Sequence, residues 1–475
     1  MTRYLVGIDN GSQSSKVTVF DERGGVVAEG RVPLRPNHTP APGVVEHPDD
    51  DLWDSIAAAC RIAMEAFPGD PSEIVGVGLC TIRFCRAVLR ADGSLAQPVL
   101  SWMDARVGAP FVAEQDDVAY VTTSSGYVTH RLTGAFRDTA ANYQGVWPID
   151  TDTWRWSEDE AAYAATGMRR DQLVELVAPG EVLGTVTAEA AAATGLPVGL
   201  PVVATANDKA VEALGCGLLD PTTLLVSLGT YIAGMSVGER NIDGASDFWT
   251  NFGSEPGRYL YESGGIRRGM WTVSWFRDLL GPDFAAAADA AGERAEDRLG
   301  REAADVPAGS DGLLTVLDWL APADATFRKG SILGFDGRQG RAHVYRSILE
   351  GIAMTMRDRG DAMAAELGTA YRRVVVSGGG SSSDLMMQIM SDVFQAPTIR
   401  VVGDSAAGRG AAICAAVATG VHPSFEAAAA AMVVERDRFT PDPSAAAVYD
   451  ALRAVHADVT AHTDEVYRRT AAIVG

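Results

Sequence analysis

Residues 4–21 read YLVGIDNGSQSSKVTVFD, in which two apolar runs flank the short polar segment NGSQSS. Both runs are rich in β-prone side chains, and the Asn10-Gly11 pair between them is a strong turn signal because glycine accepts positive φ angles. The stretch therefore predicts an N-terminal β-hairpin. Asp9 ends the first run, where a carboxylate is costly unless it meets a cation or hydrogen-bond donors.

Small residues fill the predicted turn, and they would let backbone N–H groups approach an anion closely. A hairpin without any ligand explains the same residues. However, residues 222–237, TTLLVSLGTYIAGMSV, repeat the design, with Gly229 and Thr230 between two apolar runs. Two such hairpins about half a chain apart predict an internal repeat. We expect two related domains, each presenting a small-residue turn to one phosphate-bearing ligand.

The composition indicates a large globular protein that carries a strong negative charge. A chain of 475 residues corresponds to about two to three domains, and its 47% apolar content can bury a large core. Lys and Arg number 40 against 62 Asp and Glu, which gives a net charge of −22. Such a charge disfavours nucleic acids and anionic membranes as partners. Apolar runs also stay below the ~18 residues expected of a membrane span.

The cysteines give no sign of a metal site or a disulfide framework. They are 5 in number and scattered, without any CxxC spacing: Cys60, Cys80, Cys85, Cys216 and Cys414. This pattern is typical of a reducing compartment. The N-terminal residues MTRYLVGID lack a signal-peptide pattern, so we expect a cytoplasmic protein.

Strand-like runs alternate with helical patterns along the chain, which predicts α/β layers with helices covering a mainly parallel core. The Leu-Asp-Pro break at residues 219–221 lies just before the second hairpin, so we place the domain boundary between residues 220 and 221. The predicted domains are therefore 1–220 and 221–475. The clearest expected helices are residues 49–67, 285–297, 343–364, 383–394, 405–419 and most of 445–470, and residues 313–319 are expected to form a strand.

Asp208 follows the apolar run of residues 200–206 and opens the next helical pattern. In α/β folds, ligands bind at the carboxyl ends of such strands. A carboxylate there can accept the proton of a substrate hydroxyl that attacks a phosphoryl group. The alternative is a plain helix N-cap, a position that Asp also favours.

Two further stretches offer side chains suited to hydroxyl groups. Arg83 follows the apolar run at residues 74–79, and its guanidinium requires a planar acceptor or hydroxyls, although a structural ion pair would also satisfy it. Trp102, Asp104 and Arg106 occupy alternate positions and share one face if extended. Trp102 would then present a flat platform to a sugar and Asp104 would accept hydrogen bonds from its hydroxyls. An exposed salt-bridged loop is the alternative.

The run Gly378-Gly379-Gly380 stands between a predicted strand and a helix capped by Ser382 or Ser383. This arrangement resembles a nucleotide-binding loop, although a tight turn explains it equally. The chain lacks the GxxxxGK[ST] motif, a complete dinucleotide fingerprint, HExxH and GxSxG, which excludes the enzyme classes that depend on these motifs.

Taken together, these stretches resemble the FGGY family of carbohydrate kinases over nearly the whole chain. GIDNGSQSSKVTVFD is similar to the first phosphate motif of the family, with Ser12 in place of Thr and Lys16 as the basic residue. The other similar stretches follow in family order: WMDAR, LTGAFRDTAAN, ANDKAVEALGCG with the catalytic Asp, the second phosphate motif SLGTYIAG, GSILGFDGRQGRAHVYRSILEGIA, and the adenosine motif SGGGSSSDLMMQIMSDVFQAPTIRV.

The resemblance implies two actin-like (ribonuclease-H-like) domains that close over ATP, Mg²⁺ and a small sugar or polyol in a central cleft. It implies transfer of the γ-phosphate to a terminal hydroxyl, with Asp208 as the base and Asp9 holding Mg²⁺, mostly through water. A homodimer is compatible with it. The implied substrate-binding residues are Arg83, Trp102, Asp104 and Asn207. The implied nucleotide-binding residues are Gly11, Ser12, Ser14, Lys16, Gly229, Thr230, Gly264, Gly379, Gly380 and Asp384.

Departures from the family pattern concern the substrate. Phe84 stands where glycerol kinases have the Glu of an Arg-Glu pair, and residues 81–84 lack the Met-His pair of xylulose kinases. The segment between Arg106 and Tyr127 is short for the family, and Asp384 replaces a common Asn. These differences favour a four-carbon polyol or ketose such as erythritol or erythrulose, followed by a pentulose or pentitol. The competing hypothesis is an actin-fold ATP-binding sensor or regulator without kinase activity.

Overall fold

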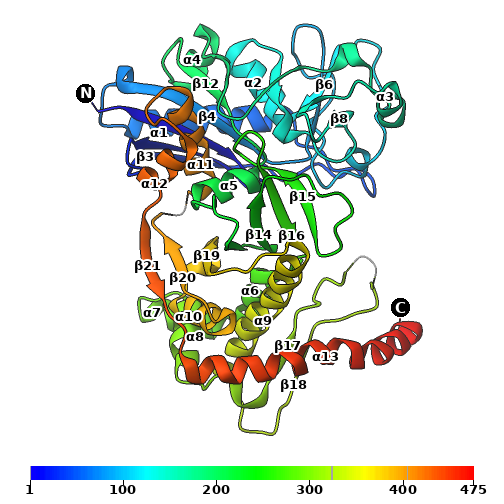
Figure 1. The fold of residues 1–475 in the computed structure, drawn as a ribbon, viewed down its shortest axis with the longest axis vertical. Coiled ribbons are helices and arrows are strands. Elements are labelled where there is room, and N and C mark those ends of the chain that lie inside the picture. The colour runs from blue at the N-terminus through cyan, green and yellow to red at the C-terminus, as the bar shows by residue number, and fades with distance from the viewer. Residues whose placement is uncertain (1, 323–324, 404, 475) are drawn as a thin grey trace.

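The computed structural model describes residues 2–322, 325–403 and 405–474. Two β-sheets, one in each half of the chain, form the centres of two α/β domains that lie one above the other in Figure 1. The first sheet has the order β11-β12-β4-β1-β2-β3 and the second the order β15-β16-β14-β13-β19-β20-β21. The α/β class and the two-domain arrangement predicted from the sequence are confirmed.

The strands of the first sheet are β1 (Tyr4–Asn10), β2 (Ser14–Asp21), β3 (Val26–Pro33), β4 (Ile74–Thr81), β11 (Val182–Thr185) and β12 (Pro201–Ala204). Those of the second are β13 (Thr223–Leu228), β14 (Ile232–Gly238), β15 (Phe248–Phe252), β16 (Tyr259–Ser263), β19 (Arg373–Ser377), β20 (Thr398–Val401) and β21 (Glu435–Phe439). Two-stranded ribbons pair β5 (Arg86–Leu89) with β6 (Tyr120–Thr123), β7 (Arg137–Thr139) with β10 (Glu175–Val177), β8 (Ile149–Asp150) with β9 (Arg155–Trp156), and β17 (Leu314–Val316) with β18 (Ser331–Leu333).

The helices are α1 (Asp51–Ala66), α2 (Ser124–Thr133), α3 (Glu160–Thr166), α4 (Ala188–Thr194), α5 (Asp208–Gly215), α6 (Gly269–Leu279), α7 (Pro282–Ala290), α8 (Ala295–Ala304), α9 (Arg341–Leu367), α10 (Asp384–Phe394), α11 (Ala406–Ala418), α12 (Phe425–Met432) and α13 (Pro443–Val474). Among the described residues, no helix combines the length and apolar character needed to cross a membrane.

The two sheets repeat one plan, which explains why the two hairpin sequences look alike. β1 and β2 pair antiparallel, as do β13 and β14. The first strand of each hairpin also pairs in parallel with a later strand, β1 with β4 and β13 with β19. A further parallel strand follows in each case, β12 beside β4 and β20 beside β19. The predicted internal repeat is therefore confirmed.

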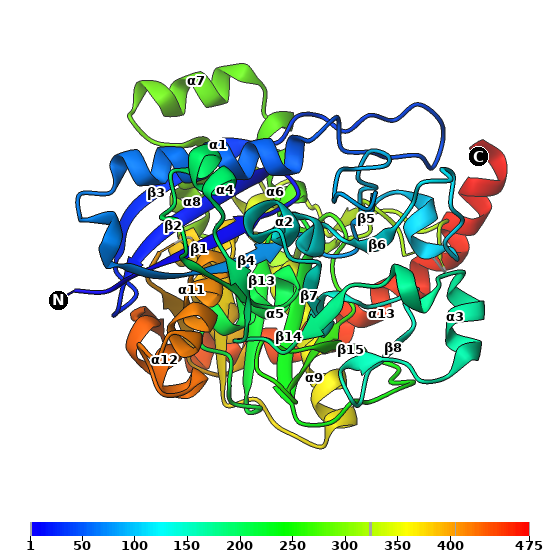
Figure 2. The same ribbon diagram turned by 90° about the horizontal axis from the view of Figure 1, so that it is seen from above.

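Side chains of β1 alternate between two helical layers. Val6 and Ile8 pack in the cluster that includes α1, whereas Leu5 packs in the cluster that includes α11 and α12. Figure 2 shows α1 and α11 on either side of the strands. On the α11 side a Cβ on Gly7 would lie 1.9 Å from the carbonyl oxygen of Gly408, so only glycine permits this approach of helix to strand.

The segment that carries α11 and α12 belongs to the second half of the sequence but packs on the first sheet. The chain leaves the second sheet after β20, covers the first sheet with these helices, and returns as β21 (Figure 1). The predicted boundary at 220–221 separates the two sheets along the sequence. In space, residues 406–432 cross back over it.

Two local predictions differ from the structure, and an arrangement that required an extended segment is not adopted. The helix expected at 285–297 is two helices, α7 and α8, interrupted where Gly292 adopts a φ of 73°. The strand expected at 313–319 is only β17. Residues 102–108 are not extended, because the Asp104 side chain accepts a hydrogen bond from the Arg106 backbone and begins a 3₁₀ helix over Ala105–Gly108.

Candidate active site

A cavity of about 1870 Å³ opens between the two domains and receives both hairpin turns. Gln13 lines it from the turn between β1 and β2, and Gly229 and Thr230 line it from the turn between β13 and β14. The loop after β19 adds Gly379 and Gly380. The cavity therefore brings the two small-residue turns and the triple-glycine loop to one place.

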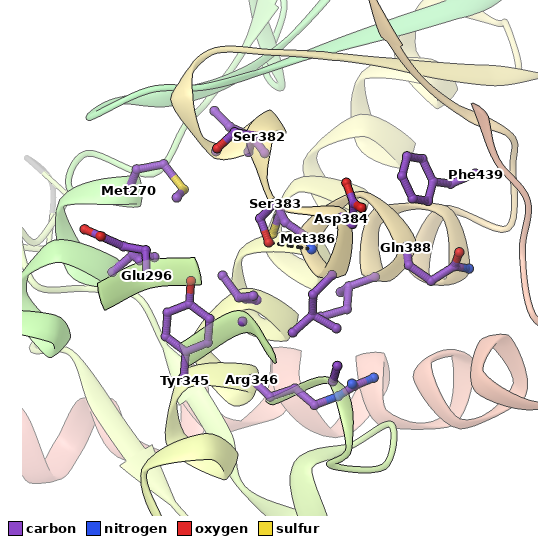
Figure 3. Close-up of a pocket in the computed structure, with 18 of the residues that line it drawn as sticks. Met270, Glu296, Tyr345, Arg346, Ser382, Ser383, Asp384, Met386, Gln388 and Phe439 are labelled. Atoms are coloured by element: carbon purple, nitrogen blue, oxygen red, sulfur yellow. Dashed lines mark hydrogen bonds between the residues drawn. The ribbon is translucent and has the colours of Figure 1, made fainter. Parts of the chain in front are cut away.

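The start of α10 forms one wall of this cavity (Figure 3). Ser383 caps the helix by accepting a hydrogen bond from the Met386 backbone at 3.2 Å. Asp384 follows it, with a side chain that is 78% exposed and accepts a hydrogen bond from Arg400 at 2.8 Å. Met270 and Phe439 also line the cavity, and they belong to no motif that the sequence analysis singled out. Tyr345 lines it as well, and it lies within the stretch GSILGFDGRQGRAHVYRSILEGIA.

The other residues predicted for the nucleotide occupy the edges of the first hairpin and the end of β16. The Ser14 hydroxyl accepts a hydrogen bond at 3.1 Å from Arg31, which lines the cavity. Lys16 forms an ion pair with Glu29 at 2.9 Å. Gly11 and Ser12 make the turn itself, closed by a hydrogen bond from the Gly11 backbone to the Ser14 carbonyl. Gly264 follows β16, and a Cβ there would lie 3.9 Å from the Arg359 guanidinium.

Asp208 is the first residue of α5, and Asn207 is its N-cap. The Asn207 side chain accepts a hydrogen bond from the Ala210 backbone at 3.1 Å and is almost fully buried. Because Asn207 caps the helix, Asp208 is not the N-cap that the sequence analysis considered as the alternative. Its carboxylate accepts a hydrogen bond from the Lys209 backbone and remains 27% exposed. A carboxylate so placed can accept a proton from a bound molecule.

Arg83 joins the two domains beside Asp208. Its two terminal nitrogens donate to the Glu262 carboxylate at 2.8 and 3.1 Å, and its Nε lies 3.6 Å from Asp208 Oδ1. The guanidinium also lies over the Trp249 ring, 4.9 Å from its centroid. Glu262 is buried on β16. The structural ion pair considered as an alternative is therefore present, and it holds one edge of Arg83 toward the Asp208 carboxylate.

Asp104 is buried within its loop, whereas Trp102 is exposed beside a small cavity. The Asp104 side chain is buried, and its carboxylate accepts hydrogen bonds from Val45 and Arg106. Trp102 is 47% exposed and lines a separate cavity of about 210 Å³ together with Phe84 and Trp147. Asp104 thus fixes its own loop, whereas Trp102 presents its ring to open space.

Phe84 adopts a φ of 67°, a left-handed conformation that bulky side chains rarely take. Its ring stacks on Trp249 of the other domain, with ring centroids 6.2 Å apart. Such strain is usually retained at functional sites. Residue 84 therefore lies at the junction of the small cavity, Arg83 and the second domain.

Burial and repulsion from nearby carboxylates raise the pKa values of Asp9 and Asp208. Burial, followed by the charges of Asp208 and Glu212, raises the pKa of Asp9 to about 7. Burial also raises the pKa of Asp208, while Arg83 and Lys209 oppose the rise. A divalent cation would relieve this repulsion.

The donor atoms at Asp9 and Asp208 fit Mg²⁺. Within the described ranges no group of three or more His, Cys, Asp or Glu side chains forms a metal cage. Mg²⁺ does not require one, since it typically binds one or two carboxylates and completes its shell with water and phosphate oxygens. Asp9 and Asp208, whose charges repel each other, supply two such carboxylates.

Lys209 and Glu212 were missed by the sequence analysis. Lys209 Nζ donates to the Glu212 carboxylate at 2.8 Å and to the Ser227 hydroxyl at 3.2 Å. The spacing of Glu212 from Asp208, one helical turn, was a signal that could have placed both acids on one helix face. Glu262 offered no comparable signal.

Two models of one protein family match the chain in succession. The N-terminal domain of the FGGY family of carbohydrate kinases matches residues 4–114 and 110–215, and the C-terminal domain of that family matches residues 224–419. Together they cover the first sheet and most of the second, whose last strand β21 lies beyond the matched residues.

Individual proteins agree with this assignment. An uncharacterized sugar kinase of Escherichia coli, YgcE, is 47% identical over 98% of this chain and 95% of its own length. A xylulose kinase of Bacillus subtilis is 25% identical over 98% of both chains. The solved structure of a xylulose kinase from Rhodospirillum rubrum superposes with a TM-score of 0.84 at 25% identity, covering 98% of this chain and all of that one. The chain therefore belongs to the FGGY family of carbohydrate kinases, and it is an ATP-using sugar kinase of the FGGY type.

Proposed function

We propose that this kinase transfers the γ-phosphate of ATP to a terminal hydroxyl of a four- or five-carbon ketose or alditol, with Asp208 as the general base. The observation that carries the proposal is the partly exposed Asp208 carboxylate, which does not cap its helix and lies 3.6 Å from the Arg83 guanidinium. A base must lie within reach of the attacking hydroxyl and must be unprotonated. Arg83 and Lys209 both favour the unprotonated form.

The nucleotide would bind in the large cavity, with its phosphates between the two hairpin turns. Gly229, Thr230 and the Gly379-Gly380 pair would supply backbone and hydroxyl donors to phosphate oxygens, and Asp384, which lines the same cavity, would lie near the adenosine. Asp9, with Asp208 nearby, would hold Mg²⁺, which neutralises phosphate charge when bound. The fit of carboxylate ligands to Mg²⁺ supports this assignment.

The sugar would bind between Asp208 and the small cavity. Arg83 would direct hydroxyl groups toward the base, and Trp102 and Phe84 would cover an apolar sugar face. The volume of about 210 Å³ beside these rings supports a small acceptor. Xylulose kinases among the relatives favour five carbons, whereas Phe84 in place of an acid favours fewer hydroxyl contacts.

During the reaction Asp208 would take the hydroxyl proton as the oxygen attacks the γ-phosphorus, and ADP would leave. The Arg83–Glu262 ion pair would hold the two domains together around the reacting groups. Such closure limits hydrolysis of ATP by water. The five unpaired cysteines and the use of ATP fit a cytoplasmic location, which we propose on that basis.

Measurement of ADP release over a panel of four- to six-carbon ketoses and alditols tests the proposal. We expect stimulation above the ATP-only rate by a four- or five-carbon member, and no stimulation in an Asp208→Asn variant. If no member of the panel stimulated ADP release, the result would contradict the proposal and favour the ATP-binding sensor without kinase activity. At present the sensing role is not favoured, because the relatives are sugar kinases.

A further inference from the structure

Glu212 connects the helix that carries Asp208 to the second domain. One of its carboxylate oxygens, Oε1, accepts hydrogen bonds from the hydroxyls of Ser227 at 2.7 Å and Ser377 at 2.6 Å. The other oxygen, Oε2, accepts a hydrogen bond from Lys209 Nζ at 2.8 Å. The side chain is 15% exposed, so these contacts lie inside the domain interface.

The two serines stand directly before the two nucleotide turns. Ser227 lies near the end of β13, two residues before Gly229, and Ser377 is the last residue of β19, before the triple-glycine loop. The two serines are register partners in the parallel β13–β19 pair. Glu212 therefore contacts the carboxyl ends of the two adjacent strands β13 and β19, from which both turns begin.

The base and Glu212 move together because α5 is short and firmly held. Asp208 and Glu212 lie one helical turn apart on the same helix. Arg409 of α11 donates to the Gly215 carbonyl at 2.9 Å, at the other end of α5. Lys209, next to Asp208, adds a second link through its contact with Ser227 at 3.2 Å.

Glu212 is charged in this setting. Burial raises its pKa, but the Lys209 ammonium and the two serine hydroxyls outweigh burial, so its pKa lies below the ordinary value. A buried carboxylate with charged and neutral donors has a defined geometry and resists displacement.

We propose that Glu212 is a positioning residue, which fixes the distance between Asp208 and the two nucleotide turns and so aligns the base with the phosphate donor. This inference rests on the proposed function of Asp208. It assigns no contact between Glu212 and either substrate. Its loss should therefore impair the chemical step more than the binding of either substrate.

The test compares Glu212→Ala, Glu212→Gln and a Ser227→Ala/Ser377→Ala double variant with the wild type. Glu212→Ala should lower kcat roughly 100-fold, the effect of about 1 Å of misalignment, with the Kd of ADP and the sugar KM changed less than about three-fold. Glu212→Gln keeps an acceptor oxygen for both serines and should recover most of that loss. The double variant keeps the Lys209 pair and should lose kcat roughly 10-fold.

Asp51→Asn is the matched control, because Asp51 is a buried acid whose ion pair with Arg35 stays within the first domain. It should lower thermal stability without a selective fall in kcat. If Glu212→Ala reduces kcat no more than Asp51→Asn, or raises the Kd of ADP in proportion to the loss of kcat, the positioning role is overturned.

Amide hydrogen exchange gives a readout that does not depend on sugar turnover. Bound ADP should slow exchange in α5 of the wild type, because the nucleotide turns hold Glu212, and should fail to do so in Glu212→Ala. Slowing in both proteins would overturn the proposal. If the wild type phosphorylates no sugar yet shows the slowing that Glu212→Ala lacks, the proposed function fails while the link from Glu212 to the turns stands.

Discussion

Asp208 is available for chemistry because its neighbour Asn207 takes the capping position. Adjacent acid and amide side chains at a helix start compete for the same free backbone N–H groups. Here Asn207 accepts from the Ala210 backbone, and its amide nitrogen lies 3.4 Å from the carbonyls of Ala141 and Phe252. The Asp208 carboxylate consequently stays partly exposed, 3.6 Å from the Arg83 guanidinium.

At this scale we predict that Asp208→Asn lowers kcat by roughly three or more orders of magnitude, since a positioned base and its charge are lost together. Calorimetry should show ADP binding little changed. Asp220→Asn is the control, because Asp220 only holds a turn through Thr222. Near-normal turnover in Asp208→Asn would remove this residue from the chemistry.

Arg83→Ala should weaken sugar binding and also shift the pH dependence. Removal of a cation that favours ionised Asp208 raises the pKa of that carboxyl, so the acidic limb of the kcat profile should move to higher pH. The sugar KM should rise about ten-fold or more as hydrogen bonds to a charged group are lost. An unchanged sugar KM, measured with the best acceptor of the panel, would place Arg83 outside the sugar site.

Asp9→Asn should remove a pH dependence of stability. Burial raises the pKa of Asp9 to about 7 from 3.8, so between these values the folded chain holds a proton that the unfolded chain has lost. The free energy of unfolding therefore falls as pH rises through this window. Without Mg²⁺, the variant should have a Tm several degrees above that of the wild type at pH 8 and a similar Tm at pH 4.

The outcome with Mg²⁺ and ADP separates this effect from general stabilisation. When Mg²⁺ and ADP are added at pH 8, the Tm of the wild type should rise more than the Tm of Asp9→Asn. The reason is that only the wild type retains the carboxylate at residue 9. An equal gain in the two proteins would argue against Asp9 as the metal residue.

At the scale of elements, the packing of α5 on α11 fixes the position of Asp208, the proposed base. A Cβ on Gly410 would lie 2.0 Å from the Val211 carbonyl oxygen, and one on Gly215 would lie 1.8 Å from that of Ala406. The two helices approach at these glycines, and neither can move without the other. α11 also packs on β1. It therefore fixes the position of the helix that carries Asp208 relative to the strand that carries Asp9.

Gly410→Ala should therefore destabilise the protein and displace the base. We expect a loss of about 1–3 kcal/mol in the free energy of unfolding, typical of overpacking, and a fall in kcat. Gly300→Ala is the control, because a Cβ there meets nothing within 4 Å inside α8. That change should be neutral or stabilising, since alanine favours a helix. Denaturant titrations of both variants test the difference.

Local signals in the sequence predicted much of this arrangement. The β1–β2 hairpin follows from alternation around Asn10-Gly11, and the repeat at Gly229 follows from the same pattern. The exposure of Asp208 and the contact partners of Arg83 could not be predicted from local signals. Glu262, which binds Arg83, lies 179 residues away on the other sheet. Pairing over such separations is set by the packing of the domains, which no local pattern encodes.

At residues 102–106 a local side-chain contact decides between the extended segment and the salt-bridged loop that the sequence left open. Trp102, Asp104 and Arg106 would share one face only if the segment were extended, but the Asp104 side chain accepts a hydrogen bond from the backbone two residues on and turns the chain. Asp has this ability in turns and caps, and it competes with extended structure. The side chain then became part of the loop framework.

At the scale of the whole molecule, the chain passes back and forth between the domains. Ile413, Phe425 and Met432 of the second half pack with Leu5 and other side chains of the first sheet. The Arg83–Glu262 ion pair crosses the interface in addition. The two domains are therefore linked by apolar packing as well as by an ion pair.

A fragment of residues 1–220 should consequently fail to fold alone. It would expose the apolar face that α11 and α12 cover, a large patch of the kind that causes aggregation. A fusion that attaches residues 405–433 through a flexible linker should restore solubility and a cooperative melting transition by circular dichroism. A soluble, cooperatively melting 1–220 fragment would show that these helices are dispensable. The homodimer remains a prediction that sedimentation of the full chain can test.

The return of α11 and α12 to the first sheet also has a consequence for how the protein is made. A ribosome reaches the end of α12 about two hundred residues after it has completed α5, which at ~5–20 residues per second takes roughly 10–40 s. Throughout this interval the nascent chain carries a finished sheet with one uncovered apolar face. Chaperones that shield this face during translation would then determine how much enzyme the cell obtains from each message.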